Sequence, residues 1–180
     1  MKRALFLDRD GVINIDKGYV FKKEDILFYD GIFELVKEAN KNNYLVIVVT
    51  NQAGIGRGFY TEKDFLFLSD WIKEQFNKMN SNIDHIYYSP FHPVHGIGKY
   101  KLDSELRKPK PGMFLKAKKD YNLDLKNSIM VGDNESDLIA AHSAGIETLI
   151  NFGNTCNVYD SFFVKHLSEV QKYLVLYQEM

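Results

Sequence analysis

The sequence has very little cysteine, almost no net charge and no long apolar run, and each absence excludes a class of protein. A single cysteine, Cys156, among 180 residues rules out a disulfide framework and a cysteine-based zinc cluster. The formal net charge of -1 gives no general attraction for nucleic acid or an anionic membrane. No stretch reaches the roughly 20 apolar residues that a membrane span needs.

What remains is the composition of a globular protein, with 45% apolar and 26% charged residues. The apolar run near the N-terminus, residues 4–7, is too short for a signal peptide. We therefore expect a cytoplasmic, unprocessed protein. Its length fits one domain spanning residues 1–180.

Segments typical of strands alternate with segments typical of helices. Short apolar runs, as in buried parallel strands, occupy residues 4–7, 44–50, 83–89, 128–133 and 147–152. Helical patterns occupy residues 31–43, 61–80, 110–123, 136–145 and 166–178. This alternation predicts an α/β fold, a doubly wound, mainly parallel sheet with helices on both faces. In such sheets ligands bind at the carboxyl ends of the strands.

Carboxylates gather at those predicted strand ends. Asp8 and Asp10 follow the first strand with only Arg9 between them, and Asp133 ends the fourth. By itself, Asp8-Arg9-Asp10-Gly11 could be a capped turn, since Asp favours turns and glycine permits one. Three carboxylates at one edge instead indicate a hard cation such as Mg²⁺. One Mg²⁺ and one lysine would balance their charge and allow a phosphate dianion to approach.

Other polar groups at the same edge could bind a phosphate. Thr50 and Asn51 end the second strand and offer a hydroxyl and an amide, although the stretch could equally be an ordinary turn. The glycine-rich residues 54–58 do not match the dinucleotide pattern, and we expect a mobile loop that carries Arg57 to a ligand. Lys108 precedes Pro109, which would restrict where it points, although a basic stretch is often only a solvated loop.

The ordered set of motifs resembles the haloacid dehalogenase (HAD) superfamily of phosphotransferases. The motifs are Asp8-Arg9-Asp10-Gly11, Val49-Thr50-Asn51, Lys108-Pro109, and Gly132-Asp133 with Asp137. The stretches FLDRDGVIN, GYV, TNQAGIGRG, RKPKPGM and MVGDNESD are similar to its histidinol-phosphate and heptose-bisphosphate phosphatase branch, and most similar to the heptose-bisphosphate members. The resemblance covers residues 1–150, and the last 30 residues carry no motif.

The resemblance implies a HAD-like Rossmannoid fold without a large cap domain, and a mechanism. Asp8 would be the nucleophile that forms an aspartyl-phosphate, and Asp10 the general acid and base. Mg²⁺ would be held by Asp8, the backbone carbonyl of Asp10, and Asp133. Phosphate and substrate binding would fall to Asp16, Gly18, Tyr19, Thr50, Asn51, Gln52, Arg57, Arg107, Lys108 and Asn134. Asn134 departs from the family, which often has lysine there.

The function implied is that of a Mg²⁺-dependent phosphatase acting on a heptose bisphosphate, in the synthesis of heptose precursors of surface polysaccharide such as lipopolysaccharide. Histidinol-phosphate phosphatase is an alternative with the same chemistry. A non-catalytic phosphosugar-binding module is a second, although binding alone needs no nucleophile. A nucleic-acid phosphatase is disfavoured because no basic patch is present. We expect a monomer whose partner is the small-molecule sugar bisphosphate, not nucleic acid or a membrane.

The resemblance also raises the question of zinc in residues 89–113. Related phosphatases commonly tie this loop with zinc through Cys-x-His and Cys-x-Cys pairs. Those positions fall here on Ser89, Phe91, Ser104 and Leu106, which are poor zinc ligands or none. A substitute site from His92, His95, Asp103 or Glu105 is disfavoured because no predicted strand or helix fixes their geometry. We therefore predict a loop without zinc.

Overall fold

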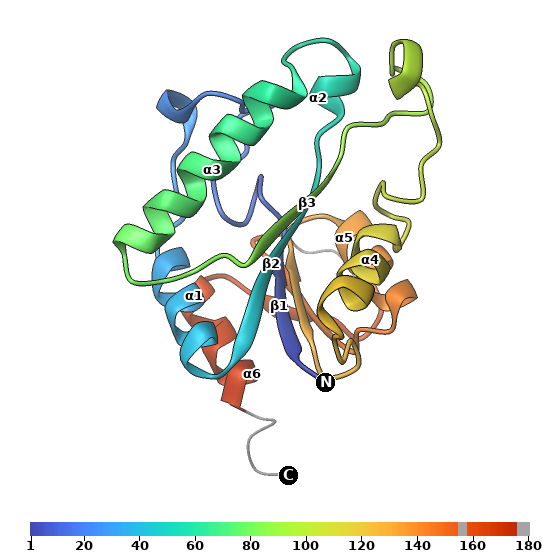
Figure 1. Cartoon of the computed structure of the whole chain (residues 1–180). Coiled ribbons are helices and arrows are strands. Elements are labelled where there is room, and N and C mark those ends of the chain that lie inside the picture. The colour runs from blue at the N-terminus through green and yellow to red at the C-terminus, as the bar shows by residue number, and fades with distance from the viewer. Residues whose placement is uncertain (155–157, 176–180) are drawn as a thin grey trace.

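A single parallel sheet, in the strand order β3-β2-β1-β4-β5-β6, forms the centre of the molecule (Figure 1). The computed structural model describes residues 1–154 and 158–175. Its strands are β1 (Arg3–Leu7), β2 (Tyr44–Asn51), β3 (His85–Ser89), β4 (Ile129–Gly132), β5 (Thr148–Phe152) and β6 (Phe162–Val164). Every predicted strand is present. The edge strand β6 was not predicted, because three residues give no periodic pattern.

Helices cover both faces of this sheet, as predicted. Figure 1 shows α1, α3 and α6 on one side and α4 and α5 on the other. The helices are α1 (Ile32–Lys41), α2 (Ala53–Gly56), α3 (Glu62–Lys78), α4 (Gly112–Tyr121), α5 (Glu135–Ala144) and α6 (Gln171–Val175). Helix α3 begins with a capping box: the Asp64 backbone N–H donates to Thr61 Oγ1 at 3.1 Å, and the Thr61 N–H donates to Asp64 Oδ2 at 2.8 Å.

Two predicted segments differ from the structure. The expected mobile loop over residues 54–58 begins as the short helix α2, packed so closely that a Cβ on Gly54 would lie 2.3 Å from the Tyr60 ring. The predicted helix 166–178 is a 3₁₀ turn, Leu167–Val170, followed by α6. Its last residues, 176–178, lie outside the described part of the chain, as does Cys156.

The core has two halves, one on each face of the sheet. Leu5 and Leu7 of β1 belong to the apolar cluster under α1, α3 and α6, whereas Ala4 and Phe6 pack with α4 and α5. Because both faces are buried, the strands have nearly continuous apolar sequences. In the described residues, no helix is both long and apolar enough to cross a membrane.

Candidate active site

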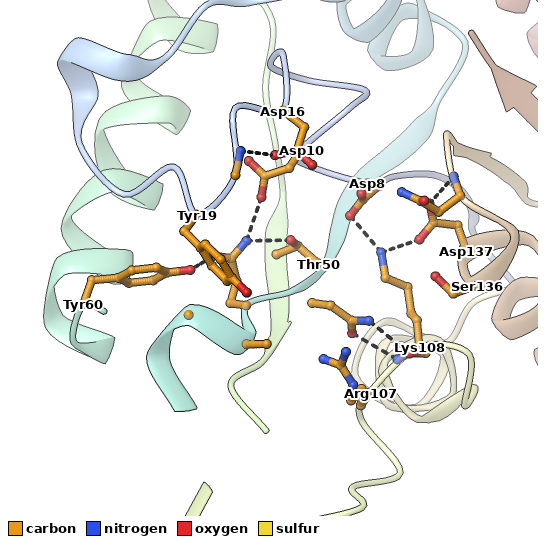
Figure 2. A pocket seen from close by; sticks show the side chains of 16 residues that line it. Asp8, Asp10, Asp16, Tyr19, Thr50, Tyr60, Arg107, Lys108, Ser136 and Asp137 are labelled. Carbon is orange, nitrogen blue, oxygen red and sulfur yellow. Dashed lines mark hydrogen bonds and ion pairs between the residues drawn. The ribbon is translucent and has the colours of Figure 1, made fainter. Parts of the chain in front are cut away.

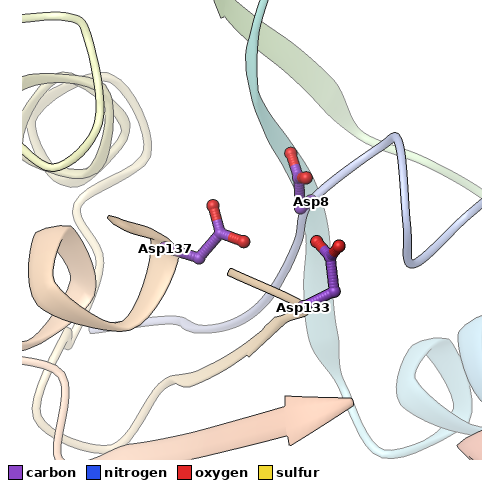
Figure 3. Close-up of side chains that lie close together, drawn as sticks. All are labelled: Asp8, Asp133 and Asp137. Atoms are coloured by element: carbon purple, nitrogen blue, oxygen red, sulfur yellow. The ribbon is translucent and has the colours of Figure 1, made fainter. Parts of the chain in front are cut away.

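Three carboxylates converge where β1 and β4 end and α5 begins. Asp8, Asp133 and Asp137 each place one oxygen within 4.8 Å of the others (Figure 3). Glycines make this approach possible. A Cβ on Gly11, whose φ is +100°, would lie 2.3 Å from the Asp133 carboxyl carbon, and one on Gly132 would lie 2.4 Å from Asp137 Cβ.

Lys108 neutralises part of this cluster from a loop far along the chain. Its ammonium donates to Asp8 Oδ1 at 2.7 Å and to the Val49 carbonyl at 2.7 Å, and it lies 2.6 Å from Asp137 Oδ1. Burial alone would lower the pKa of Lys108, but Asp137 and Asp8 raise it above its ordinary value. An ammonium has three N–H donors, and all three are engaged. Lys108 therefore holds Asp8 in place and supplies charge.

Asn51 positions the Lys108 loop. Its carboxamide donates to the Lys108 carbonyl at 3.0 Å and accepts from the Lys108 backbone N–H at 3.0 Å. These two reciprocal hydrogen bonds attach the loop to the end of β2, much as backbone hydrogen bonds join neighbouring strands of a sheet. Asn51 is predicted to donate a hydrogen bond to a phosphoryl oxygen. One of its two side-chain N–H groups is engaged by the Lys108 carbonyl, and the other can fill this role.

The cluster retains an excess of negative charge that fits a divalent cation. Burial raises the pKa of Asp8 well above its ordinary range, which Lys108 opposes and Asp137 reinforces. Burial and the charge of Asp137 raise the pKa of Asp133 to about 6. Asp133 Oδ1 is buried without a hydrogen-bond partner. With all carboxylates ionised and Lys108 protonated, the net charge of the group is -2, and carboxylate oxygens are the ligands that Mg²⁺ prefers.

Asp10 occupies a different environment from Asp8, although only one residue separates them. Its carboxylate accepts from Arg9 Nε and Nη2 at 2.7 to 3.0 Å, from Asn14 Nδ2 at 3.0 Å, and from Gln52 Nε2 at 3.0 Å. Gln52 Nε2 also donates to Thr50 Oγ1 at 2.8 Å, and Tyr60 donates to Gln52 Oε1. Burial raises the pKa of Tyr60 to about 12, so this phenol stays protonated at neutral pH.

A cavity of about 250 Å³ opens over these groups (Figure 2). It brings together most of the predicted site: Asp8, Asp10, Asp16, Gly18, Tyr19, Thr50, Asn51, Gln52, Arg107, Lys108 and Asn134. Asp133 lies in the adjoining carboxylate cluster. Arg57 is not part of the lining, but its guanidinium lies 5.8 Å from the Tyr19 ring centre.

The outer part of the cavity is aromatic and basic. Tyr19 adopts a left-handed backbone conformation with φ of 53°, and its ring meets Phe59 edge-on at 4.7 Å. Arg107 donates to the Phe91 carbonyl at 3.2 Å. Burial, together with the nearby Arg57, lowers the pKa of Arg107. Guanidinium groups at or beside a cavity attract anions.

Some functional candidates were missed by the sequence predictions. Tyr60 and Ser136 line the cavity, and Arg9 binds Asp10, but no motif signal marks the side-chain contacts of any of them. Asp137 did carry a signal, its spacing from Asp133 in the fourth motif. The motif alone indicates no role for this carboxylate, and the structure places it against Lys108.

The loop for which zinc was considered is held by protein contacts. The His92 backbone N–H donates to the Tyr100 carbonyl at 3.0 Å, and the Ile97 N–H to the Gly56 carbonyl at 2.8 Å. His92 Nδ1 accepts from the backbone N–H of His95 at 3.0 Å, so this ring nitrogen already has a partner. The absence of zinc from this loop stays a prediction.

Comparison with known proteins places the chain in a family. A family profile described as HAD-hydrolase-like matches residues 105–155. A D-glycero-alpha-D-manno-heptose-1,7-bisphosphate 7-phosphatase of Burkholderia mallei is 58% identical over 148 residues, 82% of this chain and 78% of the relative. The chain belongs to the heptose-bisphosphate phosphatase family. It is therefore a phosphatase of the HAD type, as its motifs predicted.

Other family members support the same assignment. A D-glycero-beta-D-manno-heptose-1,7-bisphosphate 7-phosphatase of Vibrio cholerae is 48% identical over 83% of this chain and 80% of its own length. A crystal structure of the D,D-heptose 1,7-bisphosphate phosphatase from B. bronchiseptica, with magnesium and phosphate, superposes with a TM-score of 0.84 at 25% identity, covering 97% of this chain and 98% of that one. The family fold thus extends over the described part of this phosphatase, including the region beyond residue 150.

Proposed function

We propose that the protein hydrolyses the 7-phosphate of D-glycero-D-manno-heptose 1,7-bisphosphate with Mg²⁺, through a phosphorylated Asp8. One observation carries this proposal: a cavity is lined by the buried Asp8, by Lys108 and by a separately held Asp10, and a carboxylate cluster suited to a divalent cation adjoins it. The identity to relatives named for this activity supports the choice of substrate. We further propose that residues 1–180 act as one domain and as a monomer.

The chemistry follows from the two environments of the carboxylates. Asp8 attacks phosphorus, so that a bond forms from its oxygen to phosphorus while the bond to the sugar oxygen breaks. Asp10 gives a proton to the departing sugar oxygen. It then takes a proton from the water that attacks the aspartyl-phosphate, which releases phosphate and regenerates Asp8. Asp10 can serve both steps because it lies at the cavity wall, outside the cluster around Lys108.

Mg²⁺ fits the site, and Asp8, Asp133 and the Asp10 backbone carbonyl would hold it. When bound, it supplies positive charge that offsets the repulsion between the carboxylates and the incoming phosphate. Asp137 contributes indirectly, because its oxygens bind Lys108 and the Asn134 backbone N–H. Thr50 and Asn51 border the space where phosphoryl oxygens would lie.

The outer part of the cavity would receive the rest of the substrate. Arg57 and Arg107 are suited to the second phosphate, since guanidinium groups bind phosphate through paired N–H donors. Asp16 and Tyr19 line the same cavity, and we expect them to contact the sugar hydroxyls. We expect Gln52 to contact the sugar only after exchanging one of its present bonds to Asp10, Thr50 or Tyr60.

Phosphate release from defined substrates tests the proposal. The assay compares the alpha and beta anomers of the heptose 1,7-bisphosphate, the 7-phosphate alone and histidinol phosphate, each with Mg²⁺ and with chelator. We expect Mg²⁺-dependent release of one phosphate from at least one bisphosphate anomer, with kcat/KM at least about 100-fold above the monophosphates. Preference for histidinol phosphate would overturn the substrate assignment. Full activity of Asp8→Asn would overturn the mechanism.

A further inference from the structure

Arg9 is a charged residue in an unusual position. Only 1% of its surface is exposed, and it is among the largest fully buried side chains of the described chain. Its Nε and Nη2 atoms grip the Asp10 carboxylate, and Nη2 also donates to the Val20 carbonyl at 2.7 Å. The guanidinium lies 5.7 Å from the centre of the Phe65 ring.

Stability alone is a poor explanation for this burial. Removing a guanidinium from water costs several kcal/mol, and buried ion pairs can often be replaced by apolar side chains without loss of stability. Asp10 retains some exposure to the cavity and could be solvated without a partner. What a planar guanidinium adds is direction, because two nitrogens in a fixed fork set the plane of the carboxylate.

The donors around the Asp10 carboxylate come from two directions. Arg9 and Asn14 hold the carboxylate from within the β1–α1 connection, and Gln52 approaches from the cavity side. The bonds from Arg9 join two opposite charges through a forked donor, whereas Gln52 is an uncharged donor that makes a single bond, so the contact with Gln52 is the weaker one. A substrate or water can therefore displace the contact with Gln52 while Arg9 keeps the carboxylate in its orientation.

We propose that Arg9 is a positioning residue for catalysis, acting through Asp10. It fixes the orientation of the acid and base carboxylate at the cavity wall, so that Oδ2, which accepts from both Arg9 and Gln52, exchanges its contact with Gln52 for the departing sugar oxygen and later for the attacking water. The inference rests on the proposed function, since it presumes that Asp10 transfers protons. Arg9 also balances the charge of Asp10, so the Asp10 carboxylate adds no net charge to that of the Asp8 cluster.

A double-mutant cycle distinguishes this role from a purely structural one. Rates are measured for Arg9→Met, Arg9→Lys, Asp10→Asn and the combined Arg9→Met/Asp10→Asn, on the heptose bisphosphate and on an aryl phosphate. Arg3→Met is the matched control, because Arg3 lies at the opposite end of β1 with its guanidinium 4.5 Å from the centre of the Tyr44 ring. Melting curves show which variants fold.

We expect Arg9→Met to lower kcat on the sugar phosphate about 100-fold while KM changes less than about 3-fold, since general acid–base catalysis contributes 10²–10⁴-fold. The loss on an aryl phosphate, whose leaving group needs no proton, should be at least 10-fold smaller in the step that releases the aryl group. In the Asp10→Asn background the same change should cost less than about 3-fold. Arg9→Lys keeps the charge without the fork and should recover only part of kcat.

Equal losses from Arg9→Met with and without Asp10 would overturn the inference, because Arg9 would then act independently of that carboxylate. A rise in KM without loss of kcat would do the same and would assign Arg9 to the loop around Val20. If Arg9→Met does not fold, Arg9→Lys replaces it in the same cycle. A fully active Asp10→Asn would instead refute the proposed function, so the two failures are distinguishable.

Discussion

Replacing Asp133 with asparagine should stabilise the metal-free protein while abolishing its response to Mg²⁺. Asp133 lies in a cluster whose net charge is -2, and one of its oxygens has no hydrogen-bond partner. Its pKa is raised from 3.8 to about 6, first by burial and then by Asp137. One pKa unit corresponds to about 1.4 kcal/mol, so the ionised form costs at most about 3 kcal/mol of folding free energy. Partial exposure of the side chain reduces this to about 1–2 kcal/mol.

The sign of the pH dependence follows from the raised pKa. The folded protein binds this proton more tightly than the unfolded chain does, so the cost is absent below about pH 4 and complete above about pH 6. Asp133→Asn removes the charge at every pH. Its advantage over the native protein should therefore be near zero at pH 4 and largest at pH 7 to 8, where the melting temperature should rise by about 2–8 °C.

The assay is thermal unfolding in chelator and in saturating Mg²⁺ between pH 4 and 8. The native protein should gain stability from Mg²⁺, because a ligand that binds only the folded state stabilises it. Asp133→Asn should gain little and should have no phosphatase activity. Asp70→Asn, on the exposed side of α3, is the control and should change neither property. A metal-free Asp133→Asn protein that melts at or below the native temperature at pH 8 would refute the charge argument.

Further predictions concern the neighbouring residues and the loop. Asp8→Asn should fold normally but lose several orders of magnitude in kcat, because an amide is a poor nucleophile; near-normal turnover would show that Asp8 is not the nucleophile. Asp10→Asn should retain phosphate binding and lose turnover of alkyl phosphates, while aryl phosphates still release their leaving group in a single-turnover experiment. Gly11→Ala should destabilise the protein and weaken Mg²⁺ binding in a titration, because its Cβ would overlap Asp133; unchanged affinity would contradict this. Elemental analysis of protein purified without chelator should find no stoichiometric zinc, and activity restored by zinc but not by Mg²⁺ would overturn the expectation for residues 89–113.

Much of the fold and the site could be predicted because their signals are local. Strands β1, β2 and β4 are buried on both faces and therefore have continuous apolar sequences. In a parallel sheet their carboxyl ends meet at one edge, which is sufficient to bring Asp8, Thr50 and the end of β4 together.

The remaining features depend on contacts that a sequence pattern does not encode. The sequence is equally compatible with a solvated Arg9, whereas in the structure its guanidinium lies near Phe65 and donates to the Val20 carbonyl as well as to Asp10. Helix α2 replaces an expected loop because Gly54 permits close packing against Tyr60. Sequence patterns indicate which side chains gather at an edge of the sheet. They do not indicate which three acceptors the Lys108 ammonium binds, because that depends on how the loop folds back onto β1, β2 and α5.

The ion pair between Lys108 and Asp8 joins residues that are 100 positions apart. Closing so long a segment costs chain entropy before the contact forms, so we expect this pair to form late as the chain folds. Until Lys108 arrives, Asp8 and Asp137 remain hydrated, where their mutual repulsion is weak. We therefore expect the carboxylates to become a tightly packed cluster only after β2 and β3 have joined the sheet and α3 has packed against it. Enzymatic turnover is therefore a stringent measure of completed folding, since chains with native-like helices but an unclosed Lys108 loop would be inactive.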